Sequence, residues 1–336
     1  MTSDNGRSMI NVIHRITGTL FGLLCMSTAS ALPLQEHLTV SRVDGTPIDV
    51  QLHRPAPAGK VPLLVFIDGS LCIPSELNDS VGWLQQQVDG RHPFALAVVE
   101  KPGPVDPPRN AGGGIDIGPD FRCSDAFRQH YTLDQRVIDH LRALQYLHRH
   151  APWWNGELWI WGFSDGGRIG AQLAAYAPQT RAVALIGFGG GAPMAESMQD
   201  MVCAANGAPT TCRQELRARM DAIRAEPVPG KDWMGEANTF AVWANRLDAV
   251  EANILRDLRA PLLVVHGERD GSVPVASARQ LATAMQGAGV PFRYVEVAGM
   301  RHSLWSTPTE AQALELHRDV LDWLHGTPAI EDDREG

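Results

Sequence analysis

Ser164 is the residue of this chain best placed to act as a nucleophile. It lies in the segment Leu158–Gly167 (LWIWGFSDGG), where an apolar run predicts a strand, and residues 168–175 after it predict a helix. A strand that turns this sharply into a helix strains its central residue, and Gly162 and Gly166 remove side chains that would otherwise collide. The pattern therefore predicts a serine hydroxyl at the tip of a rigid turn, near the positive end of a helix.

Two further residues could activate this hydroxyl. Asp270 follows the apolar stretch 262–265, which predicts a buried strand, and His302 lies in the loop after a second predicted strand at 292–297. A serine becomes a nucleophile when an imidazole accepts its proton and a carboxylate orients that imidazole. The order serine, acid, histidine therefore predicts a catalytic triad. Glu268 could compete as the acid, but it lies closer to the strand.

With these motifs the chain resembles the α/β-hydrolase superfamily over residues 36–326. The matching segments are Gly162–Gly166, His266–Pro274 and His302 after the final predicted strand. The resemblance implies an eight-stranded, mostly parallel sheet with helices on both faces. It also implies that the serine is the nucleophile, the histidine the general base and Asp270 the group that holds the imidazole. An esterase of the dienelactone-hydrolase type and a member of the prolyl-oligopeptidase type both remain open.

The resemblance also implies backbone N–H groups that stabilise an oxyanion. The family commonly has a His-Gly pair after the third strand, which corresponds here to the predicted strand 61–67 followed by Asp68-Gly69. Aspartate replaces the usual histidine, but the glycine still permits the turn. We expect the donors to be the N–H of Asp165 and that of either Ser70 or Leu71.

One large domain is predicted for residues 32–326. The chain has 336 residues, of which 44% are hydrophobic and 20% charged, and this composition suits a single α/β domain with a substantial core. The segment 190–259 is too long for a simple connection, and the resemblance implies that it forms a cap over the site. Helices are predicted in this cap near 214–224 and 237–257.

The end of the chain is expected to hold one more helix and a short tail. Thr307 could cap this helix, Pro308 suits its first turn, and Gly326 closes it. The tail at 327–336 is expected to be disordered.

Aromatic and basic residues near the expected site are candidates for substrate contacts. Phe240 and Trp243 lie in the predicted cap, and Trp305 follows soon after the catalytic histidine. Lys101 follows the predicted strand 94–100 at its carboxyl end, where α/β sheets bind ligands. Packing explains the aromatic residues equally well, and a solvated side chain explains the lysine.

Charge and metal-ligand patterns argue against several classes of function. The formal net charge is -9, and no basic tract is interleaved with aromatic residues, which disfavours nucleic acid as a partner. His148 and His150 are two residues apart and cannot share a helix face, so no metal site is expected. No cofactor is expected either, and the expected partner is a small-molecule ester substrate.

Residues 1–31 resemble a secretory signal peptide. Arg15 precedes the largely apolar stretch 16–26, and Ala29-Ser30-Ala31 offers a cleavage site of small residues, so the mature chain would begin at Leu32. The apolar run is too short for a permanent membrane anchor. The sequence therefore predicts a secreted or periplasmic protein.

Cysteine usage agrees with export. The chain has five cysteines, and cleavage would remove Cys25 and leave Cys72, Cys123, Cys203 and Cys212. An even number in an oxidising compartment predicts two disulfides. The preferred pairing is Cys72 with Cys123, both expected over the active face, and Cys203 with Cys212. Four free, buried thiols are the alternative.

Three functions are compatible with these residues. The first is an exported serine hydrolase that cleaves carboxylic esters through an acyl-enzyme. The second is a serine peptidase or amidase that uses the same triad. The third is a non-catalytic binding protein, which the intact serine, acid and histidine disfavour.

Overall fold

Strands and helices alternate along most of the chain in the computed structural model, which describes residues 33–56, 59–118, 120–204 and 209–326. The strands are β1 (Leu34–Ser41), β2 (Pro47–Arg54), β3 (Val61–Ile67), β4 (Ala95–Val99), β5 (Trp154–Phe163), β6 (Thr180–Ile186), β7 (Leu262–Gly267) and β8 (Phe292–Val297). The α-helices are α1 (Asp79–Gln87), α2 (Asp125–His130), α3 (Leu133–His150), α4 (Asp165–Tyr176), α5 (Met194–Ala204), α6 (Pro209–Ala225), α7 (Phe240–Ala244), α8 (Ala252–Leu255), α9 (Val275–Met285) and α10 (Glu310–Gly326). Two short 3₁₀ helices are η1 (Ser75–Leu77) and η2 (Leu304–Ser306).

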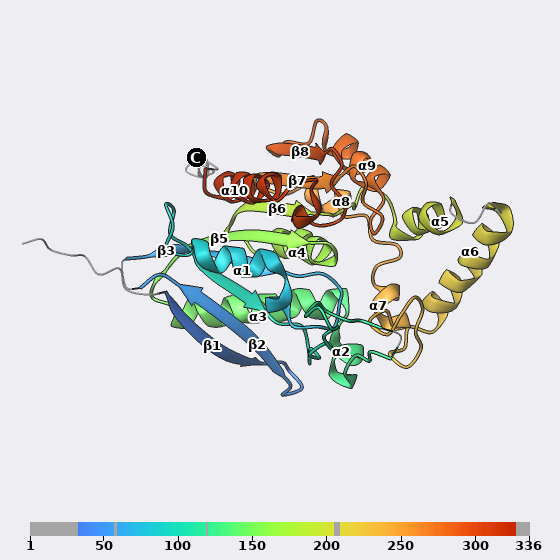
Figure 1. Ribbon diagram of the computed structural model, residues 1–336, viewed down its shortest axis with the longest axis horizontal. Coiled ribbons are helices and arrows are strands. Elements are labelled where there is room, and N and C mark those ends of the chain that lie inside the picture. Colours follow the sequence, from blue (N-terminus) through green and yellow to red (C-terminus); the bar gives the residue numbers. More distant parts are fainter. Residues whose placement is uncertain (1–32, 57–58, 119, 205–208, 327–336) are drawn as a thin grey trace, which may run out of the picture. The chain divides into compact units, whose positions relative to one another are not determined.

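The described strands form one eight-stranded sheet in the order β1-β2-β4-β3-β5-β6-β7-β8 (Figure 1). β2 runs antiparallel to β1 and β4, and the other neighbouring pairs are parallel. The expected mostly parallel sheet of eight strands is confirmed. Because the carboxyl ends of parallel strands share one edge, the loops after β3, β5, β7 and β8 meet there.

Both faces of the sheet are covered by helices. All residues of β4 and β7 are buried, and β3 and β6 are almost as completely enclosed. Strands buried on both faces are expected to be largely apolar, as these are apart from Thr180 and Arg181 of β6 and His266 of β7. Helices α1 and α10 pack on one face, and α3, α4, α8 and α9 pack on the other. The sheet is therefore a rigid platform for the loops at its carboxyl edge.

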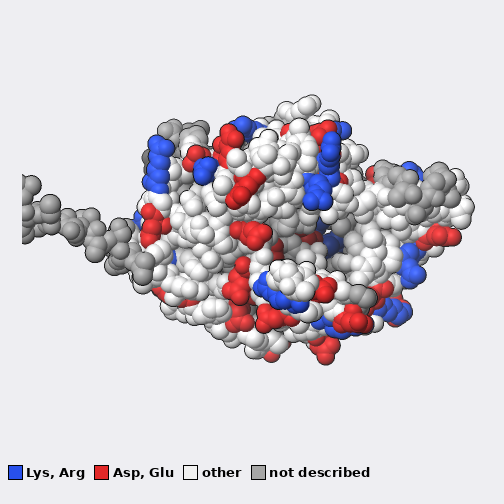
Figure 2. Space-filling view, viewed as in Figure 1, with Lys and Arg blue, Asp and Glu red and all other residues white. Residues whose placement is uncertain are grey.

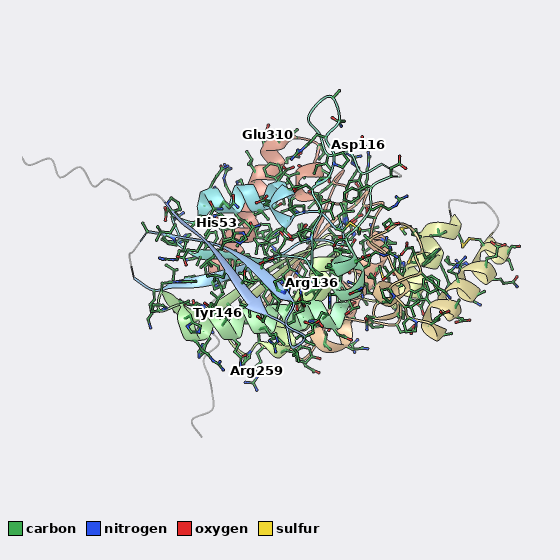
Figure 3. All side chains as sticks on the ribbon, turned by 90° about the horizontal axis from the view of Figure 1, so that it is seen from below. His53, Asp116, Arg136, Tyr146, Arg259 and Glu310 are labelled. Carbon is green, nitrogen blue, oxygen red and sulfur yellow. A yellow bond between two sulfur atoms is a disulfide. The ribbon has the colours of Figure 1, made fainter. Side chains whose placement is uncertain are left out.

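A helical insertion follows β6, where the cap was expected. Its helices α5, α6 and α7 enclose an apolar cluster of their own, which includes Met198, Leu216 and Ile223. Figures 1 and 3 show α5 and α6 on the side of the domain away from β1 and β2. We call the segment between β6 and β7 the cap.

Two predicted helices differ from the observed ones. The predicted helix over 237–257 is wrong, because α7 ends at Ala244 and α8 begins only at Ala252. The chain turns between them, and the side chain of Arg246 points inward to an ion pair. Thr307 does not cap α10; the hydroxyl of Thr309 accepts the N–H of Gln312 at 3.3 Å instead.

The predicted signal peptide at 1–31 and the tail at 327–336 lie outside the described residues. Among the described residues, no helix is long and apolar enough to cross a membrane.

Candidate active site

Ser164 stands at the turn between β5 and α4. Its backbone angles are φ 55° and ψ -122°, a left-handed conformation that side chains other than glycine rarely adopt. A Cβ at Gly162 would lie 2.5 Å from the carbonyl oxygen of Gly166, and a Cβ at Gly166 would lie 2.0 Å from that of Ile67. Both glycines are therefore required by close backbone approach. The predicted strand–turn–helix is present.

His302 and Asp270 complete a chain of hydrogen bonds to this serine. His302 Nε2 lies 2.8 Å from Ser164 Oγ, and His302 Nδ1 lies 2.8 Å from Asp270 Oδ2. An ionised carboxylate only accepts hydrogen bonds, so Nδ1 carries the proton and Nε2 is free to accept the serine proton. The sequence order of these residues thus leads to one contiguous arrangement.

Asp270 is held as an ionised acid. Its Oδ1 accepts the backbone N–H groups of Ser272 and Val273 at 2.8 and 2.9 Å. Burial alone would raise its pKa, but the hydrogen bonds from His302 and from these N–H groups lower the pKa below the ordinary value of 3.8. Glu268, the competing acid, is exposed and accepts the N–H of Gly299 instead.

The loop after β3 lies against the serine. A Cβ at Gly69 would be 3.2 Å from Ser164 Cβ, and residues Asp68 to Leu71 all line the same pocket as the serine. On the other side, Asp165 opens α4, where the first N–H groups of a helix have no partner within the helix. Two backbone segments therefore flank the position where an oxyanion would form. The geometry is compatible with the expected donors.

Ser164 lines a largely apolar pocket of about 570 Å³. Figure 2 shows a hollow between the cap and the rest of the domain. The cap contributes Met194, Met198, Met201, Met234 and Trp243 to the lining. The main domain contributes Leu71, Ile73, Leu77, Ile115 and Phe163, and Phe188 lies at the start of the cap segment. The pocket thus combines the hydroxyl with flexible methionine side chains, which adapt to irregular apolar shapes.

Of the four expected substrate contacts, only Trp243 lines this pocket. Phe240 is 4% exposed and packs inside the apolar cluster of the cap, with Met220. Trp305 packs against the imidazole of His317, with ring centroids 4.5 Å apart. The structure therefore places neither ring in the lining of the pocket.

Lys101 is not a solvated lysine, and it does not line the pocket. It is 3% exposed, and its Nζ lies 2.5 Å from Asp68 Oδ2. Asn78 Nδ2 donates to Asp68 Oδ1 at 2.7 Å. The aspartate that replaces the usual histidine is thus fixed by a buried ion pair, which anchors the start of the loop after β3.

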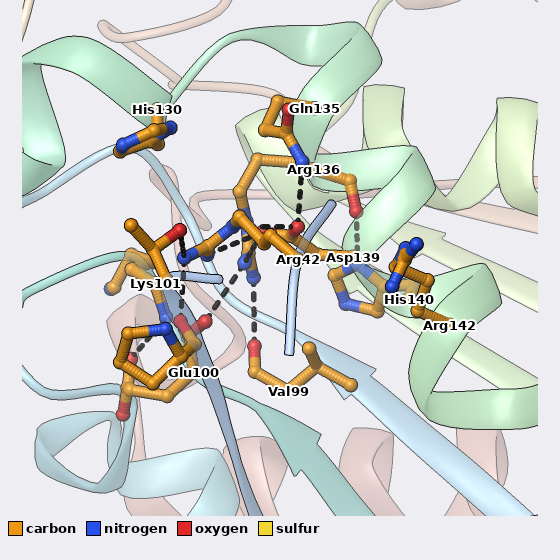
Figure 4. A network of polar contacts seen from close by, with 12 residues as sticks. Arg42, Val99, Glu100, Lys101, His130, Gln135, Arg136, Asp139, His140 and Arg142 are labelled. Atoms are coloured by element: carbon orange, nitrogen blue, oxygen red, sulfur yellow. Dashed lines mark hydrogen bonds and ion pairs between the residues drawn. The ribbon is translucent and has the colours of Figure 1, made fainter. Parts of the chain in front are cut away.

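A buried polar network continues from Lys101 along the end of β4 (Figure 4). Glu100 accepts both the hydroxyl and the N–H of Ser75, at 2.7 and 2.9 Å. Arg136 of α3 donates to the carbonyl oxygens of Val99 and Glu100. The hydrogen bonds of Ser75 to Glu100 tie the loop after β3 to the end of β4, which Arg136 holds in turn. Within the described residues, no cluster of histidine, cysteine or carboxylate side chains could hold a metal ion.

Comparisons with known proteins agree with this architecture. The sequence model described as "Prolyl oligopeptidase family" matches residues 222–328. The structure of a "Putative Dienelactone Hydrolase" from Klebsiella pneumoniae superposes with a TM-score of 0.55 at 17% identity, covering 87% of this chain and 98% of the other. The acylaminoacyl peptidase of Pyrococcus horikoshii superposes with a TM-score of 0.61 at 12% identity, covering 89% of this chain and 42% of the other. These likenesses show that the chain has the α/β-hydrolase fold.

Sequence similarity to curated proteins is confined to short stretches. "Probable dipeptidyl-peptidase 5" of Emericella nidulans is 35% identical over 75 residues, which is 22% of this chain. That stretch is 10% of the relative's own length. The esterase and peptidase branches of the α/β hydrolases therefore both stay open at this level.

Two disulfides brace the domain, with the pairing preferred from the sequence. Cys72, in the loop after β3, is bonded to Cys123, just before α2. Cys203 of α5 is bonded to Cys212 of α6. Disulfides persist in oxidising compartments, so the two bonds point to a non-cytosolic protein.

Sequence reasoning missed the polar side chains behind the serine turn. Asp165 is bound by Arg246 of the cap and by the hydroxyl of Tyr131, which follows α2. These three residues are far apart in the sequence, and no local pattern connects them. The missed helix α5 did carry a signal, since Met194, Met198 and Met201 recur with a helical period.

Proposed function

We propose that the protein is a serine hydrolase that cleaves carboxylic esters through an acyl-enzyme. The observation that carries this proposal is the hydrogen-bonded chain from Asp270 through His302 to Ser164, with both links at 2.8 Å. It ends at the wall of an apolar pocket with room for a small substrate. A nucleophile, a base and a group that orients the base are the parts that acyl transfer requires.

The proposed reaction has two halves. Ser164 Oγ attacks the ester carbonyl carbon while His302 Nε2 accepts the hydroxyl proton, and Asp270 stabilises the resulting imidazolium. The oxyanion is stabilised by the N–H of Asp165 and by one from the loop after β3, and each such donor contributes about 3 kcal/mol. His302 then protonates the leaving alcohol. In the second half a water molecule attacks the acyl-enzyme while His302 accepts its proton. His302 then returns that proton to Ser164 Oγ as the bond to the acyl group breaks and the acid is released.

The charges around the pocket favour an ester over a substrate with a free amine. Of the described residues that line the pocket, Asp68 and Asp165 are the carboxylates, and each already has a buried cation as partner. A free ammonium group would enter an apolar site without an available carboxylate, and its desolvation would be uncompensated. Neutral acyl groups have no such cost, so we propose apolar esters of short to medium length as substrates.

A serine peptidase or amidase is the second candidate. The match of residues 222–328 to the prolyl oligopeptidase family favours it. The same triad and oxyanion donors would cleave an amide, and the pocket would then accept a blocked or internal residue rather than a free N-terminus. The two candidates differ in their leaving group and can be separated by rates.

A panel of p-nitrophenyl esters against prolyl, aminoacyl and acyl-aminoacyl anilides tests this choice. We expect kcat/KM to be higher for an ester of the panel than for every anilide, and Ser164→Ala to abolish both activities. Ser197→Ala is a matched control, because Ser197 lines the same pocket on α5 but has no part in the proposed proton transfer. Faster cleavage of any anilide than of every ester would overturn the ester assignment in favour of the peptidase.

We also propose that the protein is secreted or periplasmic. The two disulfides and the leader-like residues 1–31 support this. The exported protein should begin near Leu32 on N-terminal sequencing, and it should show no free thiol before reduction. Titration of four thiols in the native protein would contradict the proposal.

A further inference from the structure

The residue after the nucleophile carries a side chain with no role in the proposed proton transfer. Asp165 Oδ1 and Oδ2 accept hydrogen bonds from Arg246 Nε and Nη2 at 2.7 and 2.6 Å, and both side chains are buried. Arg246 belongs to the cap, and its Nη1 donates to the carbonyl oxygen of Val242 at 2.8 Å. A bidentate pair of this kind fixes both position and orientation. The cap is thus bound directly to the serine turn.

Tyr131 joins this ion pair to the loop after β3. Its hydroxyl lies 2.9 Å from Asp165 Oδ2 and 3.3 Å from the carbonyl oxygen of Gly69. A hydroxyl has one proton, so the two acceptors share it in a three-centre bond. Both oxygens of Asp165 accept hydrogen bonds from Arg246, so Asp165 stays in place without Tyr131. The position of the Gly69 carbonyl depends more strongly on the tyrosine hydroxyl.

The tyrosine ring is rigidly held. It stacks on Phe127 with ring centroids 4.4 Å apart, and the guanidinium of Arg246 lies over the tyrosine ring, 5.4 Å from its centroid. The Cys72–Cys123 disulfide belongs to the same apolar cluster. Tyr131 is fully buried and is not part of the pocket lining, so its hydroxyl does not reach a substrate.

The carbonyl of Gly69 and the N–H of Ser70 belong to the same peptide group. In a trans peptide these two groups point in opposite directions. The carbonyl faces Tyr131, outside the pocket, so the N–H of Ser70 faces the opposite side. A Cβ at Gly69 would be 3.2 Å from Ser164 Cβ, and Ser70 lines the pocket. This favours Ser70 over Leu71 as the second oxyanion donor.

We propose that Tyr131 is a positioning residue for the oxyanion hole. Its hydroxyl, which is hydrogen-bonded to Asp165, fixes the Gly69–Ser70 peptide so that the N–H of Ser70 points to the oxyanion. The ion pair between Arg246 and the Asp165 side chain holds the other donor, the backbone N–H of Asp165. Both donors are thereby set by one buried network that includes a residue of the cap. The inference rests on the proposed ester hydrolysis at Ser164.

Tyr131→Phe tests this directly, because it removes the hydroxyl and keeps the ring in its stack. Complete loss of an oxyanion donor costs roughly 10²–10³-fold in kcat, so a donor that is retained but poorly held should cost about tenfold. We expect kcat for p-nitrophenyl butyrate to fall by that factor while KM stays within about twofold, as for an interaction made in the transition state. Tyr294→Phe is the matched control, because its hydroxyl also donates to a carboxylate at 2.9 Å, that of Glu296 on β8.

A trifluoromethyl ketone provides a readout that a general loss of structure would not reproduce. Its adduct with Ser164 carries an oxyanion, whereas the corresponding carbinol binds without one. In Tyr131→Phe we expect the inhibition constant of the ketone to rise by the same factor as kcat falls, and that of the carbinol to stay unchanged. A kcat within twofold of the wild type, or equal weakening of ketone and carbinol, would overturn the role of Tyr131. Activity that survives Ser164→Ala would instead overturn the proposed function.

Discussion

Gly166→Ala would place a new Cβ against the backbone at the end of β3, and the size of the overlap can be worked out from the structure. The new Cβ would lie 2.0 Å from the carbonyl oxygen of Ile67 and 2.7 Å from that of Asp68, whereas Cβ contacts under 3.0 Å essentially do not occur. The end of β3 and the start of α4 must therefore separate by about 1 Å, the difference between 3.0 and 2.0 Å. Backbone atoms of a buried strand cannot yield as a flexible side chain would.

This separation should affect both stability and rate. Overpacking of this kind costs about 1–3 kcal/mol of unfolding free energy. A displacement of about 1 Å at the catalytic groups costs on the order of 10²-fold in rate, so kcat/KM for an ester should fall by about that factor. Steady-state kinetics and urea unfolding measure the two effects separately.

Gly170→Ala is the matched control on the same helix. Its Cβ would lie 3.1 Å from a side-chain methyl of Ile160, which can move, and alanine favours a helix interior by up to about 1 kcal/mol. We expect kcat/KM within twofold of the wild type and a stability change within about 1 kcal/mol. Gly166→Ala with more than half of the wild-type activity would refute the account of the turn.

Three further predictions concern the acid, a disulfide and the pocket. The hydrogen bonds that lower the pKa of Asp270 below 3.8 stabilise the fold above that pH and are lost as the pH falls through the folded-state pKa. The difference in unfolding free energy between the wild type and Asp270→Asn should therefore be present at about pH 7 and shrink below pH 3.8. An equal difference in urea unfolding at the two pH values would contradict this. Replacing both Cys72 and Cys123 by alanine opens a loop of 51 residues and should lower the unfolding free energy by about 4 kcal/mol, with a loss of kcat. Unchanged denaturant midpoints would count against it. Trp243→Phe should raise KM more than it lowers kcat, whereas Trp305→Phe, outside the pocket, should leave KM unchanged; equal KM values would contradict the assigned lining.

The sequence was informative where a local backbone constraint determines the residue type. The glycines around Ser164 are required because a Cβ at either position would lie 2.0–2.5 Å from a backbone oxygen, and an apolar run leads into the turn. Such constraints act within a few residues and therefore leave a readable pattern. The fold and the three residues of the proposed triad could be predicted for this reason.

The sequence was misleading where long-range pairing determines the role of a residue. Lys101 is buried because it meets Asp68, which lies 33 residues earlier in the chain. The predicted helix over 237–257 is interrupted where Arg246 reaches Asp165, 81 residues earlier. Phe240 and Trp243 are both aromatic residues of α7, so residue type does not distinguish them. Only the packing of α7 decides which of the two rings lines the pocket. No local periodicity encodes these pairings.

Covalent labelling with a fluorophosphonate tests the central claim most directly. The reagent phosphonylates a serine only when a base and an oxyanion site activate it, and intact mass with peptide mapping locates the adduct. The account predicts one adduct per chain, on Ser164, with Ser164→Ala unlabelled and Ser197→Ala labelled at the wild-type rate. An adduct on another residue, or an unlabelled wild-type protein that still hydrolyses esters, would contradict it.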